Sequence, residues 1–73
     1  MYIHAKKGHK VVVTRQSIRN GLDMDKKIAL KYLQVWVVYT VEKTEIHDWH
    51  TNVYLKEIQG EYFNSVLFED FIP

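Results

Sequence analysis

One stretch near the middle of the chain limits most strongly what this sequence can fold into. Every second residue in it is apolar, and these residues form a single face: Leu33, Val35, Val37, Tyr39 and Val41. Side chains alternate between the two faces of a strand, so the pattern predicts a strand over Gln34 to Glu42. The other face carries Trp36 and Val38 as well. A strand that is apolar on one face and partly apolar on the other is either central in a sheet or the floor of a binding surface.

The N-terminal part of the chain predicts a hairpin and then a helix. Tyr2-Ile3-His4 and Lys10 to Thr14 flank the basic turn Lys6-Lys7-Gly8-His9, and the β-branched residues after the turn favour a strand. A helix is expected from about Met24 to Leu33, with Asp23 as its N-cap. Its apolar face is expected to contain Met24, Ile28, Ala29, Tyr32 and Leu33.

The segment from Thr44 to Gln59 fits either a helix or strands. Its apolar residues approximate a helical spacing and Gly60 follows them, but Val53 and Tyr54 favour strands. We prefer strands, with a turn at Gln59-Gly60. The chain is then one α+β domain over residues 1–73, with an N-terminal β-hairpin, one short helix and a three-stranded antiparallel meander. A small five-stranded β-barrel is the alternative architecture.

The chain has 73 residues and no cysteine, so no disulfide or thiolate-bound metal supplements its core. A domain of this size buries only roughly 60% of the surface that its unfolded chain exposes. The lack of cysteine suits a reducing cytosol. The longest apolar run, Val35 to Tyr39, is far shorter than the ~20 residues that span a bilayer, and no targeting segment is visible. We therefore expect a cytoplasmic protein that does not enter a membrane.

Basic and acidic residues lie in opposite halves of the sequence. Residues 1–31 hold eight basic and two acidic residues, a net charge of +6, and residues 32–73 hold two basic and seven acidic residues, a net charge of −5. Such asymmetry is a reason to look for a charged partner. The two halves are also complementary between copies, so we slightly favour a homodimer over charge pairing within one chain.

The acidic half also contains nine of the ten aromatic residues. Carboxylates interleaved with aromatic anchors are typical of a protein interface, since interfaces concentrate binding energy in aromatic side chains inside a polar rim. We predict a small, non-catalytic protein-binding domain for a partner with a basic surface. An inhibitor or adaptor of the kind that phages and mobile elements carry fits this size and composition. The candidate contact residues are Glu45, Asp48, Trp49, Tyr54, Glu57, Glu61, Tyr62 and Glu69.

The alternative is a nucleic-acid-binding module that uses the basic N-terminal hairpin and helix. Cationic side chains on a protruding element bind phosphates regardless of base sequence. The candidates are Lys6, Lys7, Lys10, Arg15 and Arg19. His47 and His50 have a spacing that a metal site can use, but exposed turn histidines are the commoner case, and we predict no metal and no cofactor. No glycine-rich phosphate loop or nucleophile motif is present, so we predict no enzymatic activity.

Overall fold

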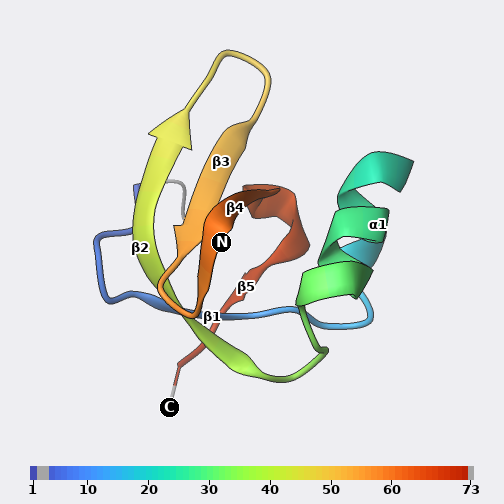
Figure 1. Ribbon diagram of the computed structural model, residues 1–73, viewed down its shortest axis with the longest axis horizontal. Helices are drawn as coiled ribbons and strands as arrows, with labels where there is room; N and C mark the ends of the chain where they lie inside the picture. Colours follow the sequence, from blue (N-terminus) through green and yellow to red (C-terminus); the bar gives the residue numbers. More distant parts are fainter. Residues whose placement is uncertain (2–3, 73) are drawn as a thin grey trace.

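A sheet of five antiparallel strands and one α-helix make up the fold of the computed structural model, which describes residue 1 and residues 4–72 (Figure 1). Along the chain the elements are β1 (Lys10–Val12), η1 (Ser17–Asn20), α1 (Asp23–Tyr32), β2 (Val38–Ile46), β3 (Thr51–Leu55), β4 (Ile58–Asn64), η2 (Ser65–Leu67) and β5 (Glu69–Asp70), where η marks a 3-10 helix. In the described part of the chain the strand order is β4-β3-β2-β1-β5, so the sheet is open, with β4 and β5 at its edges. The predicted α+β class is confirmed, and the alternative closed barrel is not formed.

β1 lies inside the sheet and joins the two halves of the chain. On one edge it pairs with β2, where Lys10 is opposite Thr40 and Val12 is opposite Val38. On its other edge it pairs with β5, where Val12 is opposite Glu69. A short strand from the basic half of the sequence is therefore flanked by two strands from the acidic half.

The basic turn that the sequence predicts before β1 is present. Gly8 has a φ of 95°, a left-handed conformation that glycine adopts without strain. The His9 amide donates a hydrogen bond to the Lys6 carbonyl at 3.0 Å, and the Gly8 amide donates to the Val41 carbonyl at 2.8 Å. The strand predicted before this turn, Tyr2-Ile3-His4, includes residues 2 and 3, which lie outside the described residues.

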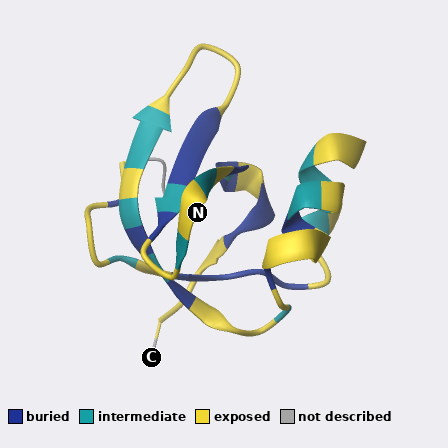
Figure 2. Ribbon diagram, viewed as in Figure 1, coloured by how far each residue is buried: buried dark blue, intermediate teal, exposed yellow. Residues whose placement is uncertain are grey.

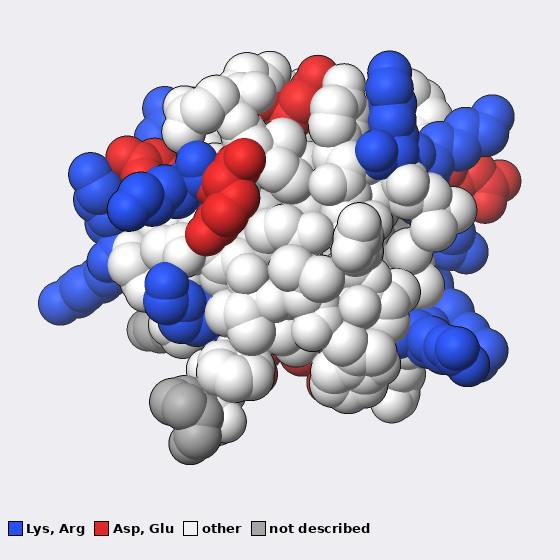
Figure 3. Space-filling model, turned by 60° about the horizontal axis from the view of Figure 1, so that its bottom comes forward, with Lys and Arg blue, Asp and Glu red and all other residues white. Residues whose placement is uncertain are grey.

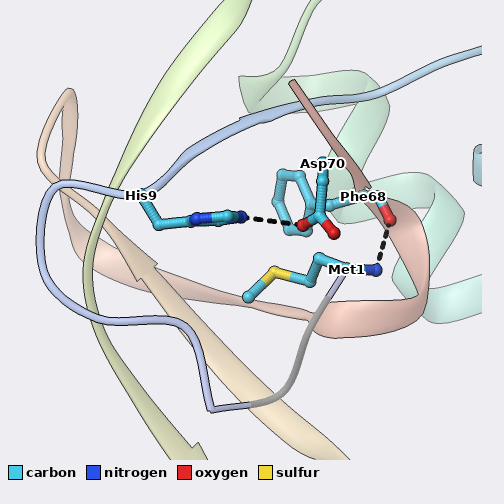
Figure 4. A network of polar contacts seen from close by, with 4 residues as sticks. All are labelled: Met1, His9, Phe68 and Asp70. Atoms are coloured by element: carbon cyan, nitrogen blue, oxygen red, sulfur yellow. Dashed lines mark hydrogen bonds and ion pairs between the residues drawn. The ribbon is translucent and has the colours of Figure 1, made fainter. Parts of the chain in front are cut away.

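Two polar contacts hold the N-terminal segment against the end of the chain (Figure 4). The amino nitrogen of Met1 donates to the Phe68 carbonyl oxygen at 2.8 Å. The Nε2 atom of His9 lies 2.8 Å from Oδ1 of Asp70. Both contacts join residues more than sixty positions apart, so they fix the same long-range arrangement that places β5 beside β1.

The strand predicted over Gln34 to Glu42 is present only in part, because β2 begins at Val38. Trp36 has a φ of 67°, which interrupts the extended chain, and this conformation costs a bulky residue on the order of 1–2 kcal/mol. The Trp36 amide donates to the Val13 carbonyl at 2.8 Å, and Val35 forms an isolated parallel bridge with Val13. Residues 34–37 are therefore a connection between α1 and β2. Apolar residues continue to alternate through residues 34–37, so the sequence pattern does not show that the strand is interrupted there.

The predicted helix is confirmed with one residue of difference, since α1 runs from Asp23 to Tyr32. Its N-cap residue is Leu22 rather than the predicted Asp23, and the Leu22 amide donates to the Asp25 carboxylate at 3.0 Å. Ala29 is buried as predicted, but Met24 is 75% exposed. Met24, in the first turn of α1, is therefore not part of the core.

Thr44 to Gln59 forms strands, as preferred from the sequence. The end of β2, the whole of β3 and the start of β4 fall in this segment. The turn between β3 and β4 lies at Lys56-Glu57, however, and not at the predicted Gln59-Gly60. Gly60 lies within β4 with a φ of 86°, where the pairing with β3 is irregular. Gly60 therefore marks a bulge in the edge strand β4 rather than a hairpin turn.

The core lies between the sheet and the segments α1 and η2, as the burial colours show (Figure 2). Its buried members are Val11, Val13, Ala29, Leu33, Tyr39, Val41, Val53, Leu55, Phe63, Leu67 and Phe68. Leu33, Tyr39 and Val41 belong to the apolar face predicted for the central strand. Val37 belongs to that predicted face too but is exposed, because it precedes β2.

A buried serine connects the two 3-10 helices, and its removal gives the first prediction. The Ser17 hydroxyl accepts from the Thr14 amide at 2.8 Å and donates to the Leu67 carbonyl at 2.7 Å. Ser17→Ala leaves both groups buried without a partner, so we expect a loss of about 1–3 kcal/mol in the free energy of unfolding. Urea denaturation measures it, with exposed Gln16→Ala as the control. Equal stability of the two variants would contradict the connecting role of Ser17.

The turn between β3 and β4 is tied to β2 through Glu57. The Glu57 carboxylate accepts a hydrogen bond from the Thr40 amide at 2.8 Å, and the Lys56 amide donates to the Thr40 carbonyl at 2.9 Å. Burial raises the pKa of the Glu57 carboxyl. The hydrogen bond from Thr40 and the nearby Lys10 ammonium together lower it by more than burial raises it, so the pKa lies below its ordinary value of 4.5. The ionised form of Glu57 therefore stabilises the fold.

The second prediction follows from the direction of this shift. A carboxyl whose pKa is lower in the folded state stabilises the fold above its unfolded pKa and loses that effect as the pH falls through its folded pKa. We expect the free energy of unfolding to fall between about pH 6 and about pH 3, and to fall less for Glu57→Gln. Denaturation at the two pH values measures the difference. An equal loss in the parent and in Glu57→Gln would show that the contact with Thr40 adds nothing.

Candidate functional site

The loop between β2 and β3 presents a tryptophan to solvent. Trp49 is 96% exposed. The loop is closed beneath it, since the His47 amide donates to the His50 carbonyl at 2.8 Å, and the two imidazole rings stack with their centres 5.0 Å apart. Figure 1 shows this loop at the top of the molecule. The chain therefore holds a large aromatic side chain at the tip of a hairpin, where it contributes nothing to the core.

A cavity of about 300 Å³ lies beside this loop. It is lined by residues from the loop, from β3, β4 and η2, and from the start of α1: Leu22, Asp25, Ile28, Trp49, His50, Asn52, Tyr62, Phe63, Asn64 and Leu67. Leu22 is exposed on its rim. Asn64 donates to the Asp25 carboxylate at 3.2 Å, so two of its polar side chains are already oriented. The cavity combines apolar walls with a few fixed polar groups, which is the usual chemistry of a binding pocket.

Next to the cavity, the exposed face of the sheet carries a tyrosine pair. The rings of Tyr54 and Tyr62 lie 5.8 Å apart, centre to centre. The Tyr54 hydroxyl donates to the Glu45 carboxylate at 2.7 Å, and the Lys43 ammonium lies 4.5 Å from the Tyr54 ring centre. The bond from Tyr54 lowers the pKa of the Glu45 carboxyl, and the same bond raises the pKa of the Tyr54 hydroxyl. These contacts hold Tyr54 in place, whereas Tyr62 is exposed and borders the cavity.

The structure brings together only part of the acidic and aromatic set predicted from the sequence. Glu45, Tyr54 and Tyr62 lie on one face of the sheet. Asp48 and Trp49 lie in the neighbouring loop. The remaining acidic residues lie elsewhere: Glu57 in the β3–β4 turn, Glu61 beside Tyr32 with a hydrogen bond of 3.1 Å, and Glu69 on the far edge strand β5. The candidate site is therefore centred on Trp49 and Tyr62.

Sequence reasoning missed the residues that close the cavity from the other side. Leu22, Asp25 and Ile28 come from the segment around the start of α1. Their spacing indicates only a helix face, and nothing in the sequence shows that this end of α1 faces β4 and the β2–β3 loop. The one sequence signal for these cavity residues is Leu22, an apolar residue directly after Gly21, at a position where a polar N-cap residue is usual.

The five basic residues of the alternative interpretation do not form one continuous surface. Lys6 and Lys7 precede β1, and Lys7 pairs with Glu42 at 3.2 Å. Lys10 donates to the Thr40 hydroxyl at 2.6 Å. The two arginines follow β1 at its other end, Arg15 in a loop and Arg19 in η1. Figure 3 shows basic side chains in separate groups on either side of a broad uncharged surface.

In the part of the chain that the structure describes, the histidine pair of the β2–β3 loop has no third metal ligand beside it. His47 and His50 stack with their rings 25° from parallel. Within the described residues, no three histidine or carboxylate side chains come together in a group that could hold a metal ion. Among the described helices, none is long and apolar enough to cross a membrane.

Comparison with known proteins places this arrangement in a family. No curated protein and no solved structure matches the chain significantly. A protein-family match covers residues 4–73, which include every element of the fold and every residue of the cavity. The chain therefore belongs to the family described as Bacteriophage T4 protein Y07B.

Proposed function

We propose that this chain is a small protein-binding domain whose contact site is the Trp49 side chain together with the adjoining cavity. The observation that carries the proposal is the 96% exposure of Trp49 beside apolar walls. Tryptophan is among the residues that most often dominate protein interfaces. A soluble domain has no folding reason to hold such a side chain in water at the tip of a closed loop.

The energy available at this site is large for so small a domain. A buried tryptophan removes about 200 Å² of surface from water, which corresponds to roughly 5 kcal/mol before the costs of association are subtracted. Tyr62 and Leu22 are exposed next to it and enlarge the apolar area. Because the loop is already closed and the Asp25 carboxylate already oriented, binding orders few additional groups.

The charges near the site favour a partner with basic groups around an apolar contact. Asp25 lines the cavity, and Asp48 precedes Trp49 in the loop. No lysine or arginine is among the described residues that line the cavity. A partner that inserts an apolar side chain flanked by cations would match this surface in shape and charge. Such complementarity chiefly raises the association rate and the specificity.

Stoichiometric binding fits the family to which the chain belongs, because that family takes its name from a bacteriophage protein. A phage domain of this size that binds a protein of the bacterial host acts as an inhibitor or as an adaptor. The exposed aromatic side chains support a protein, rather than a nucleic acid, as the partner. The basic residues, by contrast, are divided between the two ends of β1 and are partly paired with acidic groups.

The third prediction concerns Trp49. In a quantitative pull-down from a bacterial lysate with the immobilised chain, Trp49→Ala should weaken capture of a specific protein by about 30-fold, the effect of a typical interface hot spot. Trp49→Phe should retain part of the binding, because it keeps an aromatic ring. Lys27→Ala, on the exposed side of α1, is the matched control and should bind like the parent.

Two results would contradict the proposal. Equal capture by the parent and by Trp49→Ala would show that the tryptophan is not the contact. Capture that disappears when the lysate is treated with nuclease would assign the chain to nucleic acid, and Lys6→Ala and Lys10→Ala would then reduce it and make it less sensitive to salt.

A further inference from the structure

The cavity of the candidate site contains a carboxylate that the fold holds in place. Within the described residues, both hydrogen bonds that Asp25 accepts go to Oδ2, one from the Leu22 amide at 3.0 Å and one from the Asn64 side-chain amide at 3.2 Å. Gly21 packs so closely against Asp25 that a Cβ atom at position 21 would lie 2.9 Å from the Asp25 Cβ. Three neighbours therefore fix this side chain at the wall of the cavity.

The second carboxylate oxygen of Asp25 remains available to a ligand. No donor among the described residues bonds to Oδ1. Among the described residues that line the cavity, Asp25 is the one carboxylate, and no lysine or arginine accompanies it. Asp23 also lies in the first turn of α1, and the two carboxylates outweigh the partial positive charge of about half a unit at the start of a helix. A cation that enters the cavity therefore meets an oriented acceptor.

Aromatic rings form much of the remaining wall. Trp49, Tyr62 and Phe63 line the cavity. Phe63 is buried, whereas Trp49 and Tyr62 are exposed, so their rings are accessible to a partner. Figure 1 shows the start of α1 and the β2–β3 loop, which carry Asp25 and Trp49, at the same upper end of the molecule. A carboxylate beside aromatic rings is the combination with which proteins recognise organic cations.

We propose that the cavity binds an arginine side chain of the partner protein, with the guanidinium group on Oδ1 of Asp25 and the alkyl stem against Trp49 and Tyr62. This inference rests on the proposed function, because it names the residue that the partner inserts. One arginine supplies both the apolar contact and the cation that the site favours, since its stem is apolar and its head is charged. The planar guanidinium group also stacks on aromatic faces.

Arginine fits this cavity better than lysine or an apolar residue. A guanidinium group is more weakly hydrated than an ammonium group, so it loses less when it leaves water. An apolar side chain would contact the walls but would separate Oδ1 of Asp25 from water without supplying a donor, which weakens binding. The cavity volume of about 300 Å³ lies at the lower limit of ligand pockets, about 300 to 1,000 Å³, so it suits one side chain.

The fourth prediction uses single-residue probes and needs no partner protein. N-acetylarginine methylamide, added to the isotopically labelled chain at about 1 to about 50 mM, a range suited to weak ligands, should shift the nuclear magnetic resonance signals of the Leu22 amide and the Trp49 indole. The citrulline analogue has the same shape but no charge. It should bind about 10-fold more weakly, because a charge-assisted hydrogen bond is lost. The lysine analogue should also bind more weakly than the arginine probe.

Two variants with the same change of charge locate the contact. Asp25→Asn keeps an oxygen that can accept from Leu22 and Asn64, and it should bind the arginine and citrulline probes equally. Asp23→Asn, the matched control, changes the same turn of α1 at a residue outside the cavity wall. It should keep the preference of about 10-fold for arginine. The comparison of the probes on the parent chain does not depend on the folding of either variant.

Failure of this proposal is distinguishable from failure of the proposed function. Equal binding of the three probes to the parent, or an arginine preference that Asp25→Asn retains, would overturn arginine as the occupant. In the pull-down, the arginine probe at about 20 mM, well above a millimolar dissociation constant, should reduce capture of the specific protein more than the citrulline probe does. An equal effect of both probes would also overturn the proposal. If Trp49→Ala captures that protein as well as the parent does, the proposed function itself fails, whatever the probes show.

Discussion

The pairing of β1 with strands on both of its edges is the constraint on which the rest of the structure depends. β1 spans only Lys10–Val12, yet it connects β2 to β5 and so fixes the place of the C-terminal segment. The contacts of Met1 with Phe68 and of His9 with Asp70 hold the same segments together from outside the sheet. Without β1 the meander β2-β3-β4 would keep its local pairing, but the chain after Asn64 would have no strand to join.

This pairing also determines where the basic and acidic halves of the sequence lie in the folded chain. A sequence with a basic first half and an acidic second half can fold into a molecule with two charged poles. Here the basic strand is inserted between acidic ones, so Lys7 meets Glu42 and His9 meets Asp70 within one chain. On the face drawn in Figure 3, basic and acidic side chains accordingly lie near one another instead of at two separate poles.

The sequence predicts well what local periodicity controls. The α+β class, the helix beginning near Asp23, the basic turn at Gly8 and the strands over Thr44 to Gln59 all follow from spacing and turn residues. It fails where a single backbone conformation decides the outcome. Trp36 adopts a left-handed conformation in the middle of an alternating run, and Gly60 forms a bulge instead of a turn. No pattern rule anticipates either of them.

The candidate site was only partly predictable for a related reason. Trp49, Tyr54 and Tyr62 were recognisable because aromatic residues near carboxylates are typical of interfaces. Their neighbours Leu22 and Asp25 come from a segment that only tertiary packing brings beside them. Only composition points to the acidic residues Glu57 and Glu69, and the fold places them away from the cavity.

We propose that Trp49 and the adjoining cavity are where this chain contacts a protein partner. Amide hydrogen exchange measured by mass spectrometry tests this claim directly, because it locates protection along the chain. Adding a captured partner should slow exchange around residues 22–28 and 47–52, which line the cavity, and should leave residues 56–57 in the β3–β4 turn unchanged. Unchanged exchange around residues 47–52, or protection at residues 56–57 instead, would contradict this proposal.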